Sequence, residues 1–326
     1  MNRELSLSER FMVAVCLAVM VCSVSATMNS VSLYRGDMIA VQSSILHRQP
    51  FSSSDGQVMD MPEFRGRILM PVLLGASQRL AGGSPELWFS MWRLITALLL
   101  FVIVLQLAPG PWHWRVAGAG LIAYLLVLCW SEHPTDFPDV AFTIGFCALA
   151  LADRWYSLLL LTLLAALNRE SAAFAGVIWI GVRSVPATAA DRLIQFGKGA
   201  TLSVAAYTTV LALRYAFSVP TEGQWLQTFA LPRLPQLVRE FVEHPTPSGW
   251  PVLLAASAAP LFWLTWRLRH VRTRDEDGLV LAGAVVVAIT LCFGLINEIR
   301  VFLPPFAILA FAAIHTGDRV AGDSQV

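Results

Sequence analysis

Residues 155–183 read WYSLLLLTLLAALNRESAAFAGVIWIGVR, and this stretch decides the fold class. Two strongly apolar runs flank a polar triplet, Asn168-Arg169-Glu170. Charges inside membrane segments are costly, and they are usually functional or paired. The runs therefore predict membrane helices, and the triplet predicts a polar site where two of them meet. The alternative is one long bent helix over 155–185.

The rest of the chain repeats this pattern. Hydrophobic residues make up 56% of the 326 residues and charged residues 14%, with a mean hydropathy of +0.62. Soluble domains carry about a quarter charged residues, so the composition predicts one all-α transmembrane domain over 1–326, and no basic run indicates nucleic-acid binding. A membrane helix needs roughly 17–25 mostly apolar residues. We expect about ten spans, near 11–29, 88–108, 115–131, 137–152, 155–168, 171–185, 199–218, 250–268, 279–296 and 300–316.

The orientation of these spans follows from the loop arginines. Loops rich in arginine and lysine stay in the cytoplasm, and the loop between the eighth and ninth spans is the clearest case. Placing it there puts both termini in the cytoplasm, as an even number of spans requires. The first span is expected to be an uncleaved anchor; the alternative is a signal peptide. The loops then expected outside are 30–87, 132–136, 168–170, 219–249 and 297–299.

The first outer loop, 30–87, predicts two amphipathic juxtamembrane helices. Asp37 is a suitable N-cap for a first helix, which would carry an apolar side made by Ile39, Val41, Ile45 and Leu46. Residues 67–80 have the same character and predict a second helix along the interface. The loop 219–249 is the second sizeable outer loop.

Asp37 also carries a resemblance to a known family. The stretch Gly36-Asp37-Met38-Ile39-Ala40 runs on to Arg48-Gln49-Pro50-Phe51. An acidic residue just after the first membrane helix, followed by two juxtamembrane helices, resembles the C-type (GT-C) glycosyltransferases. The resemblance implies that Asp37 is the general base for an acceptor hydroxyl, that the donor is a sugar on a polyprenyl phosphate, and that transfer is inverting. Many members have two adjacent acidic residues, whereas Met38 follows Asp37 here, so no metal cofactor is indicated.

Four further motifs are similar to a group of bacterial membrane proteins related to these transferases. The similarity covers most of the chain in order, and it implies a bacterial cytoplasmic (inner) membrane with the site on the periplasmic face. It does not indicate the substrate. The motifs are Phe64-Arg65-Gly66-Arg67-Ile68-Leu69-Met70-Pro71, Asp136-Phe137-Pro138-Asp139, Leu167-Asn168-Arg169-Glu170-Ser171 and Asn297-Glu298-Ile299-Arg300-Val301-Phe302-Leu303-Pro304.

The charged clusters are expected to form one outer site. Asp37 is the expected catalytic base, and guanidinium groups suit a phosphate because of their planar fork. The expected substrate-binding residues are Arg35, Arg65, Arg67, His133, Asp136, Asn168, Arg169, Glu170, Glu298 and Arg300.

Each candidate also has a structural interpretation that stays open. Asp37 is equally suited to cap a helix, and Arg169 with Glu170 to form a clamp between helices. Arg65 and Arg67 fit the surface of an interfacial helix. Asp136 or Asp139 fits an N-terminal cap of the fourth span. A metal at His133, Asp136 and Asp139 is less favoured, because Pro134 and Pro138 indicate a loop and a helix start.

The leading hypothesis is a membrane glycosyltransferase. It moves a sugar from a polyprenyl-phosphate donor to a lipid, glycan or protein acceptor on the outer face, among membrane lipids. One alternative is a transporter or flippase for an anionic or lipid-linked substrate, which should carry polar residues through the membrane depth. Another is a non-catalytic assembly factor, in which Asp37 is dispensable.

Overall fold

The computed structural model describes residues 6–28, 51–52, 58–59, 67–107, 111–129, 135–185, 188–217, 250–293 and 299–323. Within these ranges the regular structure is helical, apart from a short antiparallel ladder in which Phe51 pairs with Met59 and Ser52 with Val58. The all-α prediction is therefore confirmed. The elements are α1 (Leu7–Met28), β1 (Phe51–Ser52), β2 (Val58–Met59), α3 (Leu69–Ala81), α4 (Pro85–Leu107), α5 (Trp112–Leu128), α6 (Asp136–Leu151), α7 (Trp155–Ala166), the 3-10 helix η2 (Glu170–Ala173), α8 (Phe174–Ser184), α9 (Ala189–Phe217), α11 (Trp250–Arg267), α12 (Arg274–Phe293), the 3-10 helix η4 (Ile299–Phe302) and α13 (Leu303–Asp323).

Each of the ten predicted apolar segments coincides with one helix, and these helices have 11 to 29 residues. The stretch 155–185 is two helices, because α7 ends at Ala166 and α8 begins at Phe174. Arg169 between them has extended backbone, with φ −163° and ψ 158°. The single bent helix is therefore wrong. The helices that match the predicted segments are α1, α4, α5, α6, α7, α8, α9, α11, α12 and α13.

Helix α9 begins ten residues before the apolar segment predicted at 199, at Ala189. The Thr188 hydroxyl accepts a hydrogen bond from the Asp191 backbone N–H at 3.3 Å and donates one to the Asp191 carboxylate at 2.6 Å. This side-chain cap starts the helix in a stretch where charged residues, Asp191, Arg192 and Lys198, interrupt the apolar ones. A hydropathy pattern detects only the apolar part of such a helix.

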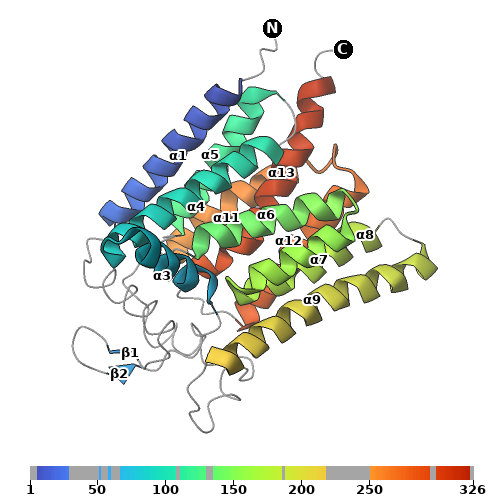
Figure 1. Cartoon of the computed structure of the whole chain (residues 1–326). Helices are drawn as coiled ribbons and strands as arrows, with labels where there is room; N and C mark the ends of the chain where they lie inside the picture. The colour runs from blue at the N-terminus through green and yellow to red at the C-terminus, as the bar shows by residue number, and fades with distance from the viewer. Residues whose placement is uncertain are drawn as a thin grey trace.

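The helices pack into a bundle, and the start of α1 and the end of α13 lie at the same end of it, at the top of Figure 1. We call this the terminal end, and the opposite end, where α3 lies, the junction end. Helices α1, α5, α7, α9 and α12 begin at the terminal end, whereas α4, α6, α8, α11 and α13 end there.

Helix α3 folds back against α4 at the junction end. Gly82 and Gly83 connect the two helices with φ values of 69° and 88°, a backbone region that favours glycine. The Trp92 indole N–H of α4 donates to the Ser77 hydroxyl of α3 at 2.8 Å. Helix α3 coincides with the second of the two helices predicted in the loop 30–87, and its position along a membrane interface stays a prediction. The first one falls outside the described residues.

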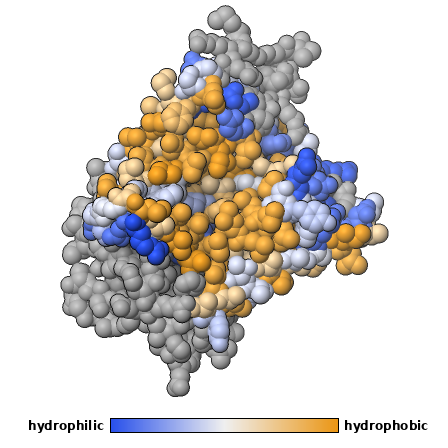
Figure 2. All heavy atoms as spheres, viewed as in Figure 1, coloured by the Kyte–Doolittle hydropathy of each residue, from blue (hydrophilic) through white to orange (hydrophobic). Residues whose placement is uncertain are grey.

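The exterior of the bundle is apolar along the helices. Figure 2 shows apolar residues over much of the middle of one face, with hydrophilic residues gathered toward its edges. By length and composition, two of the described helices are suited to cross a membrane, at Leu7–Val24 of α1 and Pro85–Leu107 of α4. Several large apolar side chains on the outside of the bundle are exposed, among them Leu160, Val204, Val252, Trp263 and Trp266. Extended patches of exposed apolar side chains are unusual in soluble monomers.

Glycines allow α8 to approach two neighbouring helices closely. A Cβ on Gly176 would collide with the backbone carbonyl oxygen of Gly199 in α9, and a Cβ on Gly181 with that of Gly278 in α12. Membrane helices commonly use small residues for such contacts. Because the obstacles are backbone atoms, relief requires the helices to separate.

We predict that Gly181→Ala destabilises the protein by about 1–3 kcal/mol, the usual cost of overpacking. The measurement is thermal unfolding of the purified chain in detergent. Gly120→Ala is the matched control, because a Cβ there meets nothing within 4 Å and alanine is the better helix former. Equal melting temperatures for the two variants would contradict the close α8–α12 contact.

Candidate functional site at the junction end

The site begins with two carboxylates in the first turn of α6. Asp136 and Asp139 are three residues apart, so they share a helix face, and they are 0% and 4% exposed. Their position favours negative charge, because helix N-termini carry a partial positive charge.

The N-cap residue of α6 is Thr135, which makes no side-chain cap hydrogen bond. The interpretation of Asp136 or Asp139 as the cap is therefore wrong.

Arg169 lies between these two carboxylates. Its Nη1 atom donates to Asp136 Oδ1 at 3.1 Å and to Asp139 Oδ2 at 3.4 Å, and the residue is 8% exposed. The Ser171 hydroxyl also donates to Asp139. Arg169 is therefore held in an internal clamp, but the carboxylates that hold it are Asp136 and Asp139 of α6 and not Glu170, the predicted partner.

Asn168 joins the same region through the backbone. Its side chain is fully buried, and Nδ2 donates to the Thr135 carbonyl oxygen at 2.9 Å. The preceding Leu167 carbonyl oxygen accepts a hydrogen bond from the Leu69 N–H at 2.9 Å. The break after α7 is thus tied both to the start of α6 and to the start of α3.

A second ion pair lies at the more exposed rim. Arg67, just before α3, donates from Nη2 to Glu170 Oε2 at 3.2 Å. The Arg67 side chain is 13% exposed and the Glu170 side chain 34% exposed. Arg67 is therefore part of the junction and not a free surface arginine of an interfacial helix.

Arg93 of α4 adds a third cation to this cluster. Its guanidinium carbon lies 5.9 Å from the centre of the Phe137 ring, and both Arg93 and Arg67 attract the Asp136 carboxylate electrostatically. Three arginines, including Arg169, then balance three carboxylates. Such a balance avoids the large cost of burying net charge. We call this set the junction cluster, made of Arg67, Arg93, Asp136, Asp139, Arg169 and Glu170.

The structure thus brings together five of the predicted site residues and adds two more. Arg93 is not among the predicted residues, and Asp139 is predicted only as a helix cap or a less favoured metal ligand, although the sequence marks both. Arg93 is a cation inside the predicted span 88–108, and Asp139 lies one helical turn after Asp136. The predicted residues that meet here are Arg67, Asp136, Asn168, Arg169 and Glu170.

Other predicted residues fall outside the described part of the chain. Asp37, Arg35, Arg65, His133 and Glu298 lie there, so their convergence on the junction cluster stays a prediction. The backbone of Arg300 belongs to η4, but its side chain lies outside the described part. Among the described residues, no three His, Cys, Asp or Glu side chains are grouped as metal ligands.

The buried ion pairs of Arg169 with Asp136 and Asp139 differ in chemical role from the more exposed pair of Arg67 with Glu170. Arg169 is buried and held by two carboxylates, so its charge is already compensated. The Arg67–Glu170 pair is more exposed and offers a cation and a carboxylate side by side. A substrate carrying both a phosphate and a hydroxyl matches that pair.

No family model, no curated protein and no solved structure matches the chain.

We predict that Arg169→Met destabilises the protein by about 3–5 kcal/mol, because it leaves two buried carboxylates without their cation. Arg67→Met serves as the comparison and should cost less than Arg169→Met, because its partner Glu170 is 34% exposed and water can solvate that carboxylate once the pair is broken. Urea unfolding of the purified chain measures both values.

The same experiment includes a rescue. Adding Asp136→Asn and Asp139→Asn to Arg169→Met removes the uncompensated charge, so the triple variant should be more stable than Arg169→Met alone. If the triple variant were less stable than Arg169→Met, charge compensation of the two aspartates would not be the contribution of Arg169 to stability.

Proposed function

We propose that this chain is a GT-C-type glycosyltransferase of a bacterial cytoplasmic membrane. It would cross the bilayer with ten helices, keep both termini in the cytoplasm and transfer a sugar from a polyprenyl phosphate on the outer face. The observation that carries the proposal is the junction cluster, in which separate predicted motifs meet at one end of the bundle.

The distribution of cations supports this orientation. Arginines beside the ends of the helices gather at the terminal end, and cytoplasmic loops carry such an excess. The junction end would then face outward. The terminal-end cations are Arg10, Arg115, Arg154, Arg183, Arg192, Lys198, Arg267, Arg269, Arg272 and Arg274.

The proposed reaction assigns a role to each charged group. The Asp37 carboxylate accepts the proton of the acceptor hydroxyl, whose oxygen attacks the anomeric carbon of the sugar. The bond from that carbon to the phosphate oxygen breaks, and polyprenyl phosphate leaves with the electron pair. Arg67 would stabilise its charge, and Glu170 would orient the acceptor or Arg67. Arg169 is a positioning residue, because it holds the α7–α8 break against α6.

The distribution of buried polar groups favours this reaction over transport. Among the described residues, the buried charged side chains lie near the bundle ends, with Asp136, Asp139 and Arg169 at the junction end and Glu276 at the terminal end. The buried hydroxyls between them donate to a carbonyl oxygen four residues earlier in their own helix, so they form no polar path. They are Thr96, Thr143, Thr162, Ser257, Thr265, Thr290 and Thr316.

The test is Asp37→Asn in cells that depend on this chain for an outer-face glycan. The variant should lower that glycan about 100-fold or more, since a general base contributes 10²–10⁴-fold. Glycan labelling measures the product, and immunoblotting of membranes checks the protein level. Asp55→Asn, in the same loop, removes an equal charge and should leave the glycan unchanged.

The leaflet in which the lipid-linked sugar accumulates separates the alternatives. A blocked transferase leaves the donor in the outer leaflet, whereas a blocked flippase leaves it in the inner leaflet. An assembly factor would lose the glycan on deletion of the chain but keep it in Asp37→Asn. Unchanged glycan in Asp37→Asn, with normal protein level, would contradict the proposed role of Asp37.

A further inference from the structure

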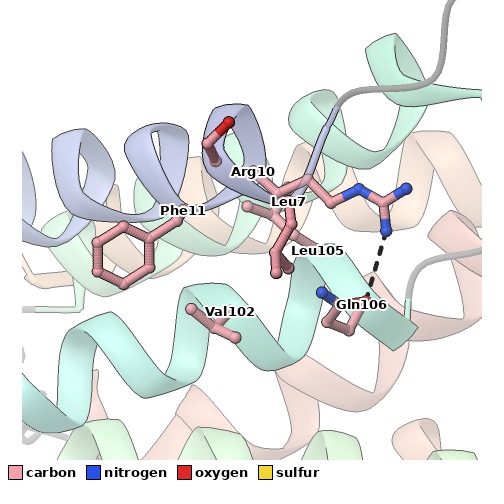
Figure 3. Close-up of a pocket in the computed structure, with 7 residues that line it drawn as sticks. Leu7, Arg10, Phe11, Val102, Leu105 and Gln106 are labelled. Carbon is pink, nitrogen blue, oxygen red and sulfur yellow. Dashed lines mark hydrogen bonds between the residues drawn. The ribbon is translucent and has the colours of Figure 1, made fainter.

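A groove of about 400 Å³ lies between α1 and α4 at the terminal end. Figure 3 shows residues from the start of α1 facing residues near the end of α4. The groove lies far along the helices from the junction cluster, because α4 carries Arg93 near its beginning and the groove near its end. It therefore belongs to a separate part of the molecule. Six of its lining residues are Leu7, Arg10, Phe11, Val102, Leu105 and Gln106.

The lining comes from one face of each helix. Helix α1 contributes Leu7, Ser8, Arg10 and Phe11, and α4 contributes Val102, Leu105 and Gln106. Residues three and four apart lie on one helix face, so α1 presents two apolar and two polar side chains to the groove, and α4 presents two apolar side chains and one polar side chain. The polar pair, Arg10 and Gln106, meets at the end of the groove, where Arg10 Nη1 lies 3.5 Å from Gln106 Oε1.

A second arginine lies beside the polar end. Arg115 of α5 donates from Nη1 to the carbonyl oxygen of Leu105, itself a lining residue, at 3.4 Å. Glu9, the acidic neighbour of Arg10, is engaged at the start of α1. Its carboxylate accepts hydrogen bonds from the Ser6 N–H at 2.7 Å and from the Ser6 hydroxyl at 2.9 Å. Arg10 is thus the cation in the lining itself, and Arg115 lies one hydrogen bond away from the lining residue Leu105.

We propose that this groove binds an anionic phospholipid, with an acyl chain against Leu7, Phe11 and Val102 and the phosphate at Arg10 and Arg115. The groove is flanked by the two described helices that are long and apolar enough to cross a membrane. Its polar end lies where α1 begins and α4 ends, which is the depth of lipid headgroups. Basic pockets between membrane helices bind anionic headgroups on the cytoplasmic side. The proposal requires α1 and α4 to span a bilayer, and it is independent of glycosyl transfer.

The arrangement favours a lipid over a soluble anion. The Leu7 and Phe11 side chains are 75% and 52% exposed, and covering apolar surface is favourable in proportion to its area. A free phosphate would leave that surface uncovered. A neutral phospholipid would fill the apolar part without matching the two cations.

The experiment is native mass spectrometry of the full-length chain, released from detergent with equal amounts of phosphatidylglycerol and phosphatidylcholine. The wild type should retain phosphatidylglycerol preferentially. Arg10→Gln and Arg115→Gln should each weaken that binding about fivefold, which is the contribution of one basic residue near an anionic headgroup. Val102→Trp, which fills the groove, should reduce retention of phosphatidylglycerol while leaving both arginines in place.

Arg154→Gln is the matched control. It removes an exposed arginine at the start of α7, at the same end of the bundle but away from the groove, and should leave retention unchanged. An equal loss in Arg154→Gln and Arg10→Gln would show a diffuse charge effect and overturn the site. Undiminished phosphatidylglycerol preference in Arg10→Gln would overturn it as well. Thermal stabilisation of the chain by inorganic phosphate, to the same extent as by phosphatidylglycerol, would overturn the lipid assignment.

Discussion

The junction end depends on one buried guanidinium. Arg169 has extended backbone at the break between α7 and η2, and it lies between Asp136 and Asp139 of α6. A buried charge is tolerated only when it is paired and hydrogen-bonded, so the chain must break where Arg169 can reach both carboxylates. That requirement fixes where α7 ends relative to α6. Helix α3 is then placed by the hydrogen bond between Leu69 and Leu167.

This constraint also separates two tasks within the cluster. The buried part, with Arg169 between the aspartates, fixes the positions of helices. The rim, with Arg67 and Glu170, keeps a cation and a carboxylate more accessible. The loop that carries Asp37 leads along the chain directly into Arg67, which is why the proposed reaction uses the rim for the leaving phosphate. A site built on fixed helix starts can hold reacting groups precisely.

The sequence predicted those features that depend on local pattern. The hydropathy pattern predicted the positions of the ten helices. The polar triplet Asn168-Arg169-Glu170 predicted the break between α7 and α8, because charged side chains are costly inside an apolar helix. The sequence did not predict that Arg169 pairs with Asp136 and Asp139. These aspartates lie 33 and 30 residues away along the chain, and the pairing depends on how α6 packs against the α7–α8 break. The contact between Gly181 and Gly278 is equally non-local. The early start of α9 was missed because Asp191, Arg192 and Lys198 lower the mean hydropathy of its first turns.

The central claim is that the two ends of the bundle face opposite sides of a membrane, with the junction cluster outward. The most direct measurement is labelling of single cysteines by a membrane-impermeant maleimide, in a variant without the five native cysteines. The account predicts that Ser54→Cys, in the first outer loop, labels in intact cells. Asp153→Cys, in the exposed turn between α6 and α7 at the terminal end, should label only after the membrane is permeabilised. Labelling of both positions from the same side would contradict the account.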